Sequence, residues 1–216
     1  MSVVEVQGSK MDVHAALTEK QPFIAYAPPE SAPEAMRGLL DRYAKRMGFL
    51  PNALKFYLHR PEIADVLWKL NDAVMRDPSS TLDQGLKRKL GAFASKVNGC
   101  KYCTTHHCEI LKSPGGFGAE GWDIPDGELG ALLDGNPQAS TPFEQVCFDF
   151  VSAASFEPTD MPDDIYGRLS ALLTPSQIVE LASLVGFWKM YNTIHDSLRI
   201  PIEQHLLARS ETVGIS

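Results

Sequence analysis

Two cysteines and a histidine stand close together near the middle of the chain, in the segment from Cys100 to His107 (CKYCTTHH). On an α-helix each residue advances by about 100°, so side chains three, four and seven positions apart share one face. Cys100 and Cys103 are three positions apart, and Cys103 and His107 are four apart. The spacing therefore predicts a helix that presents two thiols and one imidazole on the same side.

This arrangement is typical of a thiol redox centre. Asn98 and Gly99 form a helix-stop signal, which places Cys100 near the start of a new helix, where free amides and the helix dipole stabilise a thiolate. An imidazole one turn away can exchange a proton near neutral pH. We expect one thiolate to attack a peroxide O–O bond and become a sulfenic acid. The other cysteine then condenses with it, giving a Cys100–Cys103 disulfide that an external dithiol reduces.

The same residue types allow a zinc site, because cysteine and histidine are good zinc ligands. A fourth ligand would come from Cys108, His106 or elsewhere. Structural zinc sites usually draw ligands from two segments, and the chain has no second C-x-x-C or H-x-x-x-H. We therefore predict no metal and no cofactor. His106 also lies near Cys103, but the spacing favours His107 as the histidine that acts on the thiols.

The elements around this segment are expected to be helical, because apolar residues recur at steps of three and four. The expected helices are 33–47, a short one after Pro51, one from Pro61 that ends before Asp77, and then 82–97, 100–112, 143–155, 163–173 and 175–198. Thr174 and Gln177 have the spacing of a capping box, with proline between them at the first helical position. No segment alternates with the period of a strand.

The predicted fold is therefore an all-α, single-domain helical bundle. An irregular lead-in covers residues 1–30, the helical domain covers 31–209, and a short tail covers 210–216. The first 20 residues carry both acidic and basic side chains near their start and contain no long apolar region, so they do not resemble a secretory signal. No run approaches the roughly 18 apolar residues of a membrane span.

Composition narrows the function further. The 216-residue chain is 44% hydrophobic, which allows a substantial core, and its formal charge is −7. A nucleic-acid-binding protein would need a basic face, so we expect no nucleic-acid partner and no membrane partner. The expected location is the cytoplasm, and in a reducing compartment a close cysteine pair is typically catalytic or metal-binding.

Several segments together resemble the alkylhydroperoxidase D-like, carboxymuconolactone decarboxylase superfamily, and within it the peroxidase-related branch. The segments that carry the resemblance are 49–52 (FLPN), 59–62 (HRPE), 78–80 (PSS), 98–107 (NGCKYCTTHH) and 187–196 (FWKMYNTIHD). The likeness extends over roughly residues 33–205. It implies an all-α alkylhydroperoxidase D-like fold, assembly into homo-oligomers such as dimers, trimers or hexamers, and reduction of small alkyl hydroperoxides by Cys100 and Cys103.

The resemblance also implies a proton relay between His107 and a glutamate twelve residues before the first cysteine. In this chain that position is Arg88. Arginine stays protonated and cannot act as a base, but its charge could hold a thiolate or pair with a carboxylate recruited from elsewhere, such as Glu109, Glu180 or Asp196. We therefore regard Arg88, His106 and Asp196 as accessory candidates. Packing or a subunit contact is the alternative role for Asp196 and its neighbour His195.

Three functions remain open at this stage. The first is a two-cysteine peroxidase or a related disulfide oxidoreductase, an antioxidant enzyme with Cys100, Cys103 and His107 as its catalytic residues. The second is a redox- or metal-responsive protein of the same fold, in which Arg88 has weakened catalysis. The third is a lactone decarboxylase-type enzyme, which the presence of the C-x-x-C pair disfavours because such enzymes do not depend on it.

Overall fold

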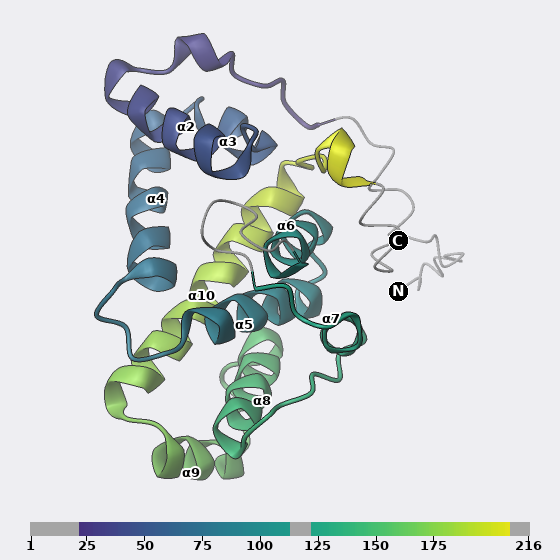
Figure 1. The fold of residues 1–216 in the computed structure, drawn as a ribbon. Helices are drawn as coiled ribbons and strands as arrows, with labels where there is room; N and C mark the ends of the chain where they lie inside the picture. Colours follow the sequence, from purple (N-terminus) through teal and green to yellow (C-terminus); the bar gives the residue numbers. More distant parts are fainter. Residues whose placement is uncertain (1–21, 113–121, 208–216) are drawn as a thin grey trace, which may run out of the picture.

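The structure is a computed structural model that describes residues 22–112 and 122–207, and these ranges contain helices and loops but no strand. The helices are η1 (Pro29–Ser31), α2 (Glu34–Met47), α3 (Asn52–Tyr57), α4 (Pro61–Arg76), α5 (Gln84–Val97), α6 (Lys101–Lys112), α7 (Asp126–Leu133), α8 (Pro142–Phe156), α9 (Asp163–Leu172) and α10 (Pro175–Ser197) (Figure 1). The prediction of an all-α fold is confirmed. Most of the predicted lead-in and the whole predicted tail lie outside the described residues.

Local capping chemistry explains where the helices begin and end. Thr174 and Gln177 form the predicted capping box at the start of α10: the Thr174 amide donates to Gln177 at 2.9 Å, and the Gln177 amide donates to the Thr174 hydroxyl at 3.3 Å. Helix α2 ends at Gly48, whose φ of 75° is the left-handed conformation that glycine tolerates. Helix α5 begins two residues later than predicted, because Asp83 caps it by accepting from the Leu86 amide at 2.9 Å.

Two buried hydrophobic clusters meet at the cysteine pair. One cluster lies among α5, α7, α8, α9 and α10, and the other joins α2, α3 and α4 to the start of α6. Cys100 and Cys103 belong to the second cluster, whereas Cys108, later on α6, belongs to the first. Met190 and Tyr191 of α10 pack against both. The central helices α5, α6 and α10 therefore hold the cysteine segment where the two clusters adjoin (Figure 1).

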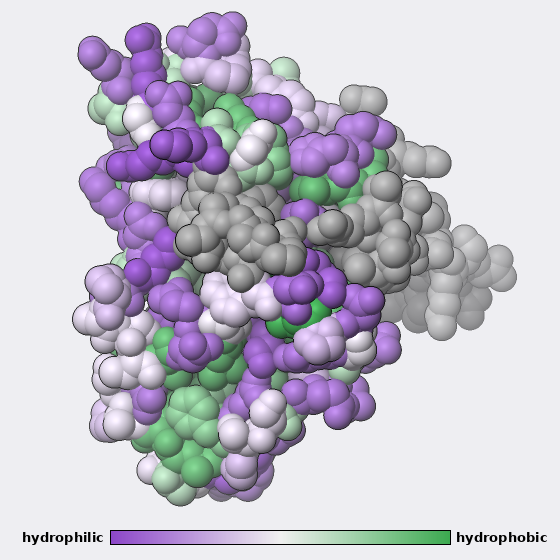
Figure 2. All heavy atoms as spheres, in the orientation of Figure 1, coloured by the Kyte–Doolittle hydropathy of each residue, from purple (hydrophilic) through white to green (hydrophobic). Residues whose placement is uncertain are grey.

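Three parts of the described chain expose large apolar side chains. The segment before η1 exposes Phe23, Ile24 and Tyr26. Ile63, Val66 and Leu70 follow one another at helical spacing on α4. The third group is contributed by α8, α9 and α10, and consists of Phe156, Tyr166, Leu172 and Val179. Figure 2 shows hydrophobic side chains gathered at the lower end of the molecule, where α8 and α9 lie in Figure 1. No helix in the described ranges is both long enough and apolar enough to cross a membrane.

A buried carboxylate ties the segment after α10 to α3 and α6. Glu203 accepts hydrogen bonds from the Asn52 amide at 2.6 Å and from the Tyr102 hydroxyl at 3.0 Å. It also pairs with Nε2 of His106 at 2.7 Å. Burial acts to raise the pKa of Glu203, but the hydrogen bond and charge of His106 and the Asn52 amide outweigh it and lower the pKa to about 2.

This lowered pKa predicts that the fold weakens in acid. A carboxylate whose folded-state pKa lies below its usual 4.5 contributes stability that is present above pH 4.5 and lost as the pH falls toward 2. The contribution of Glu203 is on the order of 3 kcal/mol. We expect the urea midpoint of the wild type to fall more steeply between pH 5 and pH 3 than that of Glu203→Gln. The exposed Glu62→Gln variant is the control, and parallel pH profiles for all three proteins would contradict the assignment.

Candidate redox site

The two cysteines lie together at the start of α6, and both are buried free thiols. Cys100 immediately precedes the helix, and its sulfur accepts a hydrogen bond from the Cys103 amide at 3.5 Å. The carbonyl of Cys100 accepts from the Thr104 amide at 3.0 Å. The predicted helix start is thus present, and the sulfurs of the pair lie within 4.8 Å of one another.

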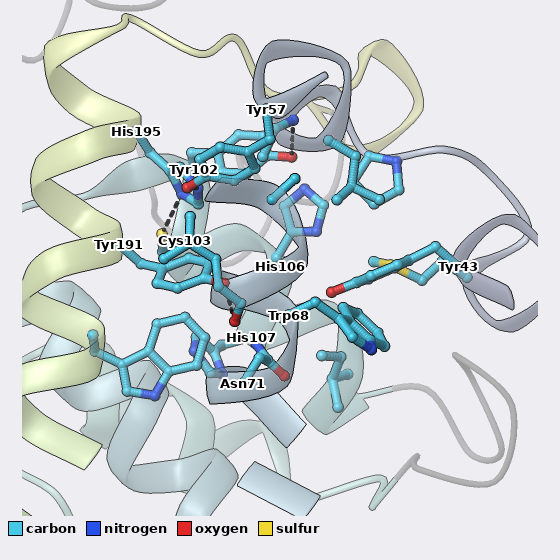
Figure 3. Close-up of a pocket in the computed structure, with 18 of the residues that line it drawn as sticks. Tyr43, Tyr57, Trp68, Asn71, Tyr102, Cys103, His106, His107, Tyr191 and His195 are labelled. Carbon is cyan, nitrogen blue, oxygen red and sulfur yellow. Dashed lines mark hydrogen bonds between the residues drawn. The ribbon is translucent and has the colours of Figure 1, made fainter. Parts of the chain in front are cut away.

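A histidine from another helix contacts the pair. Nδ1 of His195, on α10, lies 3.0 Å from Sγ of Cys103, and Nε2 of the same ring lies 2.9 Å from the hydroxyl of Tyr57 (Figure 3). Burial raises the pKa of the Tyr57 hydroxyl, with further contributions from Tyr191 and Cys103, so the phenol stays protonated. The arrangement is a continuous hydrogen-bonded chain from the Cys103 thiol through His195 to Tyr57.

His107 occupies a different environment from the one its spacing suggests. Neither of its ring nitrogens has a hydrogen-bond partner among the described residues. The ring packs edge-on against Trp188 at 4.2 Å between centroids, and a Cβ added at Gly91 would lie only 2.5 Å from it. Burial lowers the pKa of His107, and the charge of Arg88 lowers it further, so the ring is neutral. The predicted catalytic role of His107 stays a prediction, and the hydrogen bond to a thiol belongs to His195.

The surroundings shift the pKa values of the two cysteines in opposite directions. Burial acts to raise the pKa of Cys103, but the hydrogen bond from Cys100 and the charge and hydrogen bond of His195 bring it well below the usual value. The pKa of Cys100 is raised, first by its hydrogen bond to Cys103, then by burial and by the negative charge of its neighbour. The arrangement favours a Cys103 thiolate that accepts a hydrogen bond from the Cys100 thiol.

Helix α10 supplies three polar side chains to the pair. Asn192 and His195 both hydrogen-bond Cys103, and Asp196 hydrogen-bonds Cys100. Burial raises the pKa of Asp196 to about 6, against the opposing effect of its bond to Cys100. A carboxyl group with this pKa can take up and release a proton near neutral pH. Asp196, predicted as an accessory candidate, is therefore next to Cys100.

A cavity of about 120 Å³ adjoins Cys103. Cys103, His195, His106 and His107 all line it, whereas Cys100 does not. Cys103 is therefore the thiol that a small molecule in the cavity would meet first. Arg88 also lines this cavity and is buried, so the residue at the expected glutamate position does face the same space as the reactive thiol.

The pair could also hold a metal ion. The donor atoms of Cys100, Cys103 and His195 all lie within 4.8 Å of one another. Two thiolates and an imidazole are ligands that zinc and copper(I) accept. The histidine ligand would be His195 rather than His107, the histidine that the spacing suggested. The predicted absence of a metal stays a prediction.

His195 and Tyr57 are the site residues that sequence reasoning did not assign. Tyr57 gave no signal, because it reads as one apolar residue of a short helix. His195 did give one: Asn192, His195 and Asp196 stand at positions i, i+3 and i+4 of a helix that otherwise carries mostly core residues. Such a polar stripe on a buried helix indicates a site, but its partner on α6 depends on tertiary packing.

Comparison with known proteins identifies the fold. No protein-family profile matches the chain, and no curated protein matches it significantly. Solved structures do match. An alkylhydroperoxidase AhpD core, a peroxidase-related protein from Ralstonia eutropha JMP134, has a TM-score of 0.72 at 17% identity and covers 86% of this chain and 94% of its own. A peroxidase-related protein from Silicibacter sp. TM1040 gives 0.68 at 17% identity, covering 87% and 95%.

A third similar structure is the debrominase Bmp8, with a TM-score of 0.72, 17% identity and coverage of 87% of this chain and 96% of its own. A further structure of that protein holds 2,3,4-tribromopyrrole. At these identities the likeness establishes the fold and leaves the reaction open. This protein has the all-helical, AhpD-like fold of the structures that it matches.

Proposed function

We propose that the protein is a thiol oxidoreductase that reduces small hydroperoxides with Cys103 as the attacking residue. One observation carries the proposal: the sulfur of Cys103 lines a cavity and lies 3.0 Å from Nδ1 of His195, with Cys100 beside it. Such a thiol is nucleophilic near neutral pH, has a proton donor in contact, and has a second thiol available to complete a two-electron oxidation.

The proposed reaction reduces the hydroperoxide at Cys103 and then forms a disulfide with Cys100. The Cys103 thiolate attacks the terminal oxygen of ROOH, the O–O bond breaks, and the alkoxide takes a proton from His195 and leaves as ROH. Cys100 passes its proton to Asp196 and attacks the sulfenic sulfur of Cys103, and hydroxide leaves as water after taking up that proton. The pair is now a disulfide. An external dithiol returns two electrons and two protons and becomes a disulfide itself.

A second candidate reaction is reductive dehalogenation of a small aromatic ring. One specific observation favours it: tyrosine and tryptophan side chains surround the space in front of Cys103. The similar debrominase binds a brominated pyrrole. In this reaction the Cys103 thiolate would attack the halogen, the ring carbon would take a proton from His195, and Cys100 would displace halide to form the disulfide. Both reactions use the same thiols and differ only in the bond that is broken.

Other properties expected from the sequence accompany this proposal. Homo-oligomer formation is supported by the exposed apolar residues Ile63, Val66 and Leu70 on α4 and by those around α8 and α9. A cytoplasmic location suits a pair that works by returning to the dithiol state. The alternative of a redox- or metal-responsive protein is supported by the three clustered donor atoms of Cys100, Cys103 and His195.

Thiol titration separates these functions. The reduced protein has four cysteines, and one equivalent of a hydroperoxide should leave two free thiols. Cys108 and Cys147 should be the two that remain, because burial raises the pKa of each to about 12. A metal assay on the same sample and a parallel sample with tribromopyrrole complete the design. Four unchanged thiols with bound zinc would favour the metal-responsive protein, and thiol loss with the pyrrole alone would favour dehalogenation.

A further inference from the structure

Tyr57 is the last side chain of the hydrogen-bonded chain that starts at Cys103. Its hydroxyl lies 2.9 Å from Nε2 of His195, and the other ring nitrogen, Nδ1, lies 3.0 Å from Sγ of Cys103 (Figure 3). Tyr57 belongs to α3 and also lines the 120 Å³ cavity in front of Cys103. The chain therefore begins at the thiol and returns to the wall of the same cavity.

The Tyr57 hydroxyl keeps one hydrogen-bonding role for a guest in the cavity. A phenol donates one hydrogen bond and can also accept. Among the described residues, the contact with Nε2 of His195 is the only hydrogen bond of this hydroxyl. When His195 carries the proton of Cys103, both ring nitrogens donate, Nδ1 to the thiolate and Nε2 to the phenol oxygen. The O–H of Tyr57 is then available to a molecule in the cavity.

The His195 proton that faces the sulfur is poorly placed for the leaving group of a hydroperoxide. In a displacement at oxygen, the sulfur, the attacked oxygen and the leaving oxygen lie in line. The Nδ1 proton points at Sγ of Cys103 and so lies on the near side of the attacked oxygen. The leaving oxygen needs a donor farther into the cavity, and Tyr57 is the cavity-wall residue whose hydroxyl bonds His195 directly.

We propose that Tyr57 is the catalytic acid that protonates the leaving alkoxide, at the end of a relay from Cys103 through His195. The inference rests on the proposed peroxidase function, for which it specifies the route of the proton. The thiol proton of Cys103 moves to Nδ1 of His195 as the thiolate forms. When the O–O bond breaks, the phenol passes its proton to RO⁻, and the Nε2 proton of His195 moves to the phenol oxygen. The sulfur is oxidised by two electrons, and the products are ROH, the sulfenic acid and a neutral imidazole.

Burial of Tyr57 suits this role and indicates which peroxides depend on it. Burial raises the pKa of the Tyr57 hydroxyl, with smaller contributions from Tyr191 and Cys103, so the phenol keeps its proton until a strong base forms. An alkoxide is such a base, whereas a carboxylate is not. The relay is therefore needed for alkyl hydroperoxides, and not for peracids, because a peracid releases a carboxylate that leaves without a proton.

Ethyl hydroperoxide and peracetic acid are a matched pair for the test, because a CH₂ group in one is a carbonyl in the other. Both have fewer heavy atoms than benzene, which a protein cavity of about 150 Å³ holds. The rate of thiol loss in the reduced protein is measured with each. Tyr57→Phe should lower the rate constant for ethyl hydroperoxide about 10²-fold, a typical loss for a general acid, and that for peracetic acid by no more than about threefold.

Tyr191→Phe is the matched control for loss of a hydroxyl from the cavity wall. Tyr191 also lines the cavity, but its hydroxyl donates to the Leu67 carbonyl at 3.0 Å. The ratio of the two rate constants should therefore keep its wild-type value in this variant. Thermal unfolding confirms that both variants are folded. A measurement on the wild type needs no variant: D₂O should slow the reaction with ethyl hydroperoxide more than that with peracetic acid.

The possible results separate this inference from the proposed function. If Tyr57→Phe slows both peroxides by the same factor, Tyr57 acts only by positioning His195, and the relay is overturned while the peroxidase stands. Equal effects of D₂O on the two reactions would also overturn the relay. A wild-type protein that loses no thiol with either peroxide would overturn the peroxidase and the relay with it.

Discussion

Cys103→Ser should abolish hydroperoxide turnover, whereas Cys100→Ser should consume one equivalent of hydroperoxide and then stop. The difference follows from access, since Cys103 lines the cavity and contacts His195 while Cys100 is fully buried outside it. Without Cys103 no nucleophile faces the substrate, and we expect the rate to fall by a factor of about 10³ or more. Without Cys100 the sulfenic acid forms but has no resolving thiol.

Mass spectrometry after labelling with dimedone, which reacts with sulfenic acids, measures this asymmetry. The Cys100→Ser protein should carry one label at residue 103, and the Cys103→Ser protein should carry none. Cys147→Ala is the control for loss of a thiol, because Cys147 lies in the other hydrophobic cluster, and it should turn over like the wild type. A label on Cys100, or full turnover by Cys103→Ser, would show that the roles of the two cysteines are reversed.

His195→Asn should slow both hydroperoxide turnover and alkylation of Cys103 at neutral pH by a factor of 10² to 10³, a typical range for loss of a positioned acid–base group. The charge and hydrogen bond of His195 help to hold the pKa of Cys103 below its usual value. Removing them raises this pKa, so a smaller fraction of the thiol is ionised at pH 7. The iodoacetamide rate measured against pH should therefore shift to higher pH in the variant.

His107→Asn is the informative comparison for this prediction. Both histidines line the cavity, but His195 contacts the sulfur and His107 packs against Trp188. We expect the pH profile of Cys103 alkylation in His107→Asn to stay where it is in the wild type. If the profile shifts in His107→Asn and not in His195→Asn, the histidine indicated by the C-x-x-C-x-x-x-H spacing is the one that acts.

The sequence was sufficient for features that depend on neighbouring residues. Helix periodicity, the capping box of Thr174 and Gln177 and the stop at Gly48 are encoded within a few residues of where they act, and the structure has them. The proximity of Cys100 and Cys103 is of the same kind, since three residues at a helix start fix it.

The histidine that contacts Cys103 could not be predicted from the spacing of neighbouring residues. His107 has ideal helical spacing, but spacing determines only which way a side chain leaves its own helix and not what packs there. Trp188 and Gly91 bring α10 and α5 against His107, and the same packing carries His195, 92 residues from Cys103 in sequence, to the thiol. The surroundings of Arg88 also could not be predicted, because they depend on how α5 packs beside the cavity.

The sulfur of Cys100 takes part in the hydrogen bonding at the start of α6 as well as in the proposed redox chemistry. It accepts the amide hydrogen of Cys103, one of the donors that a helix start leaves without an internal partner. A sulfur bound in a disulfide is held in a new position and accepts less well from this amide, so we expect oxidation to weaken the first turn of α6. The dithiol state is favoured by this difference, and we expect the pair to have a higher reduction potential than a structural disulfide, which suits a centre that must be re-reduced in every cycle.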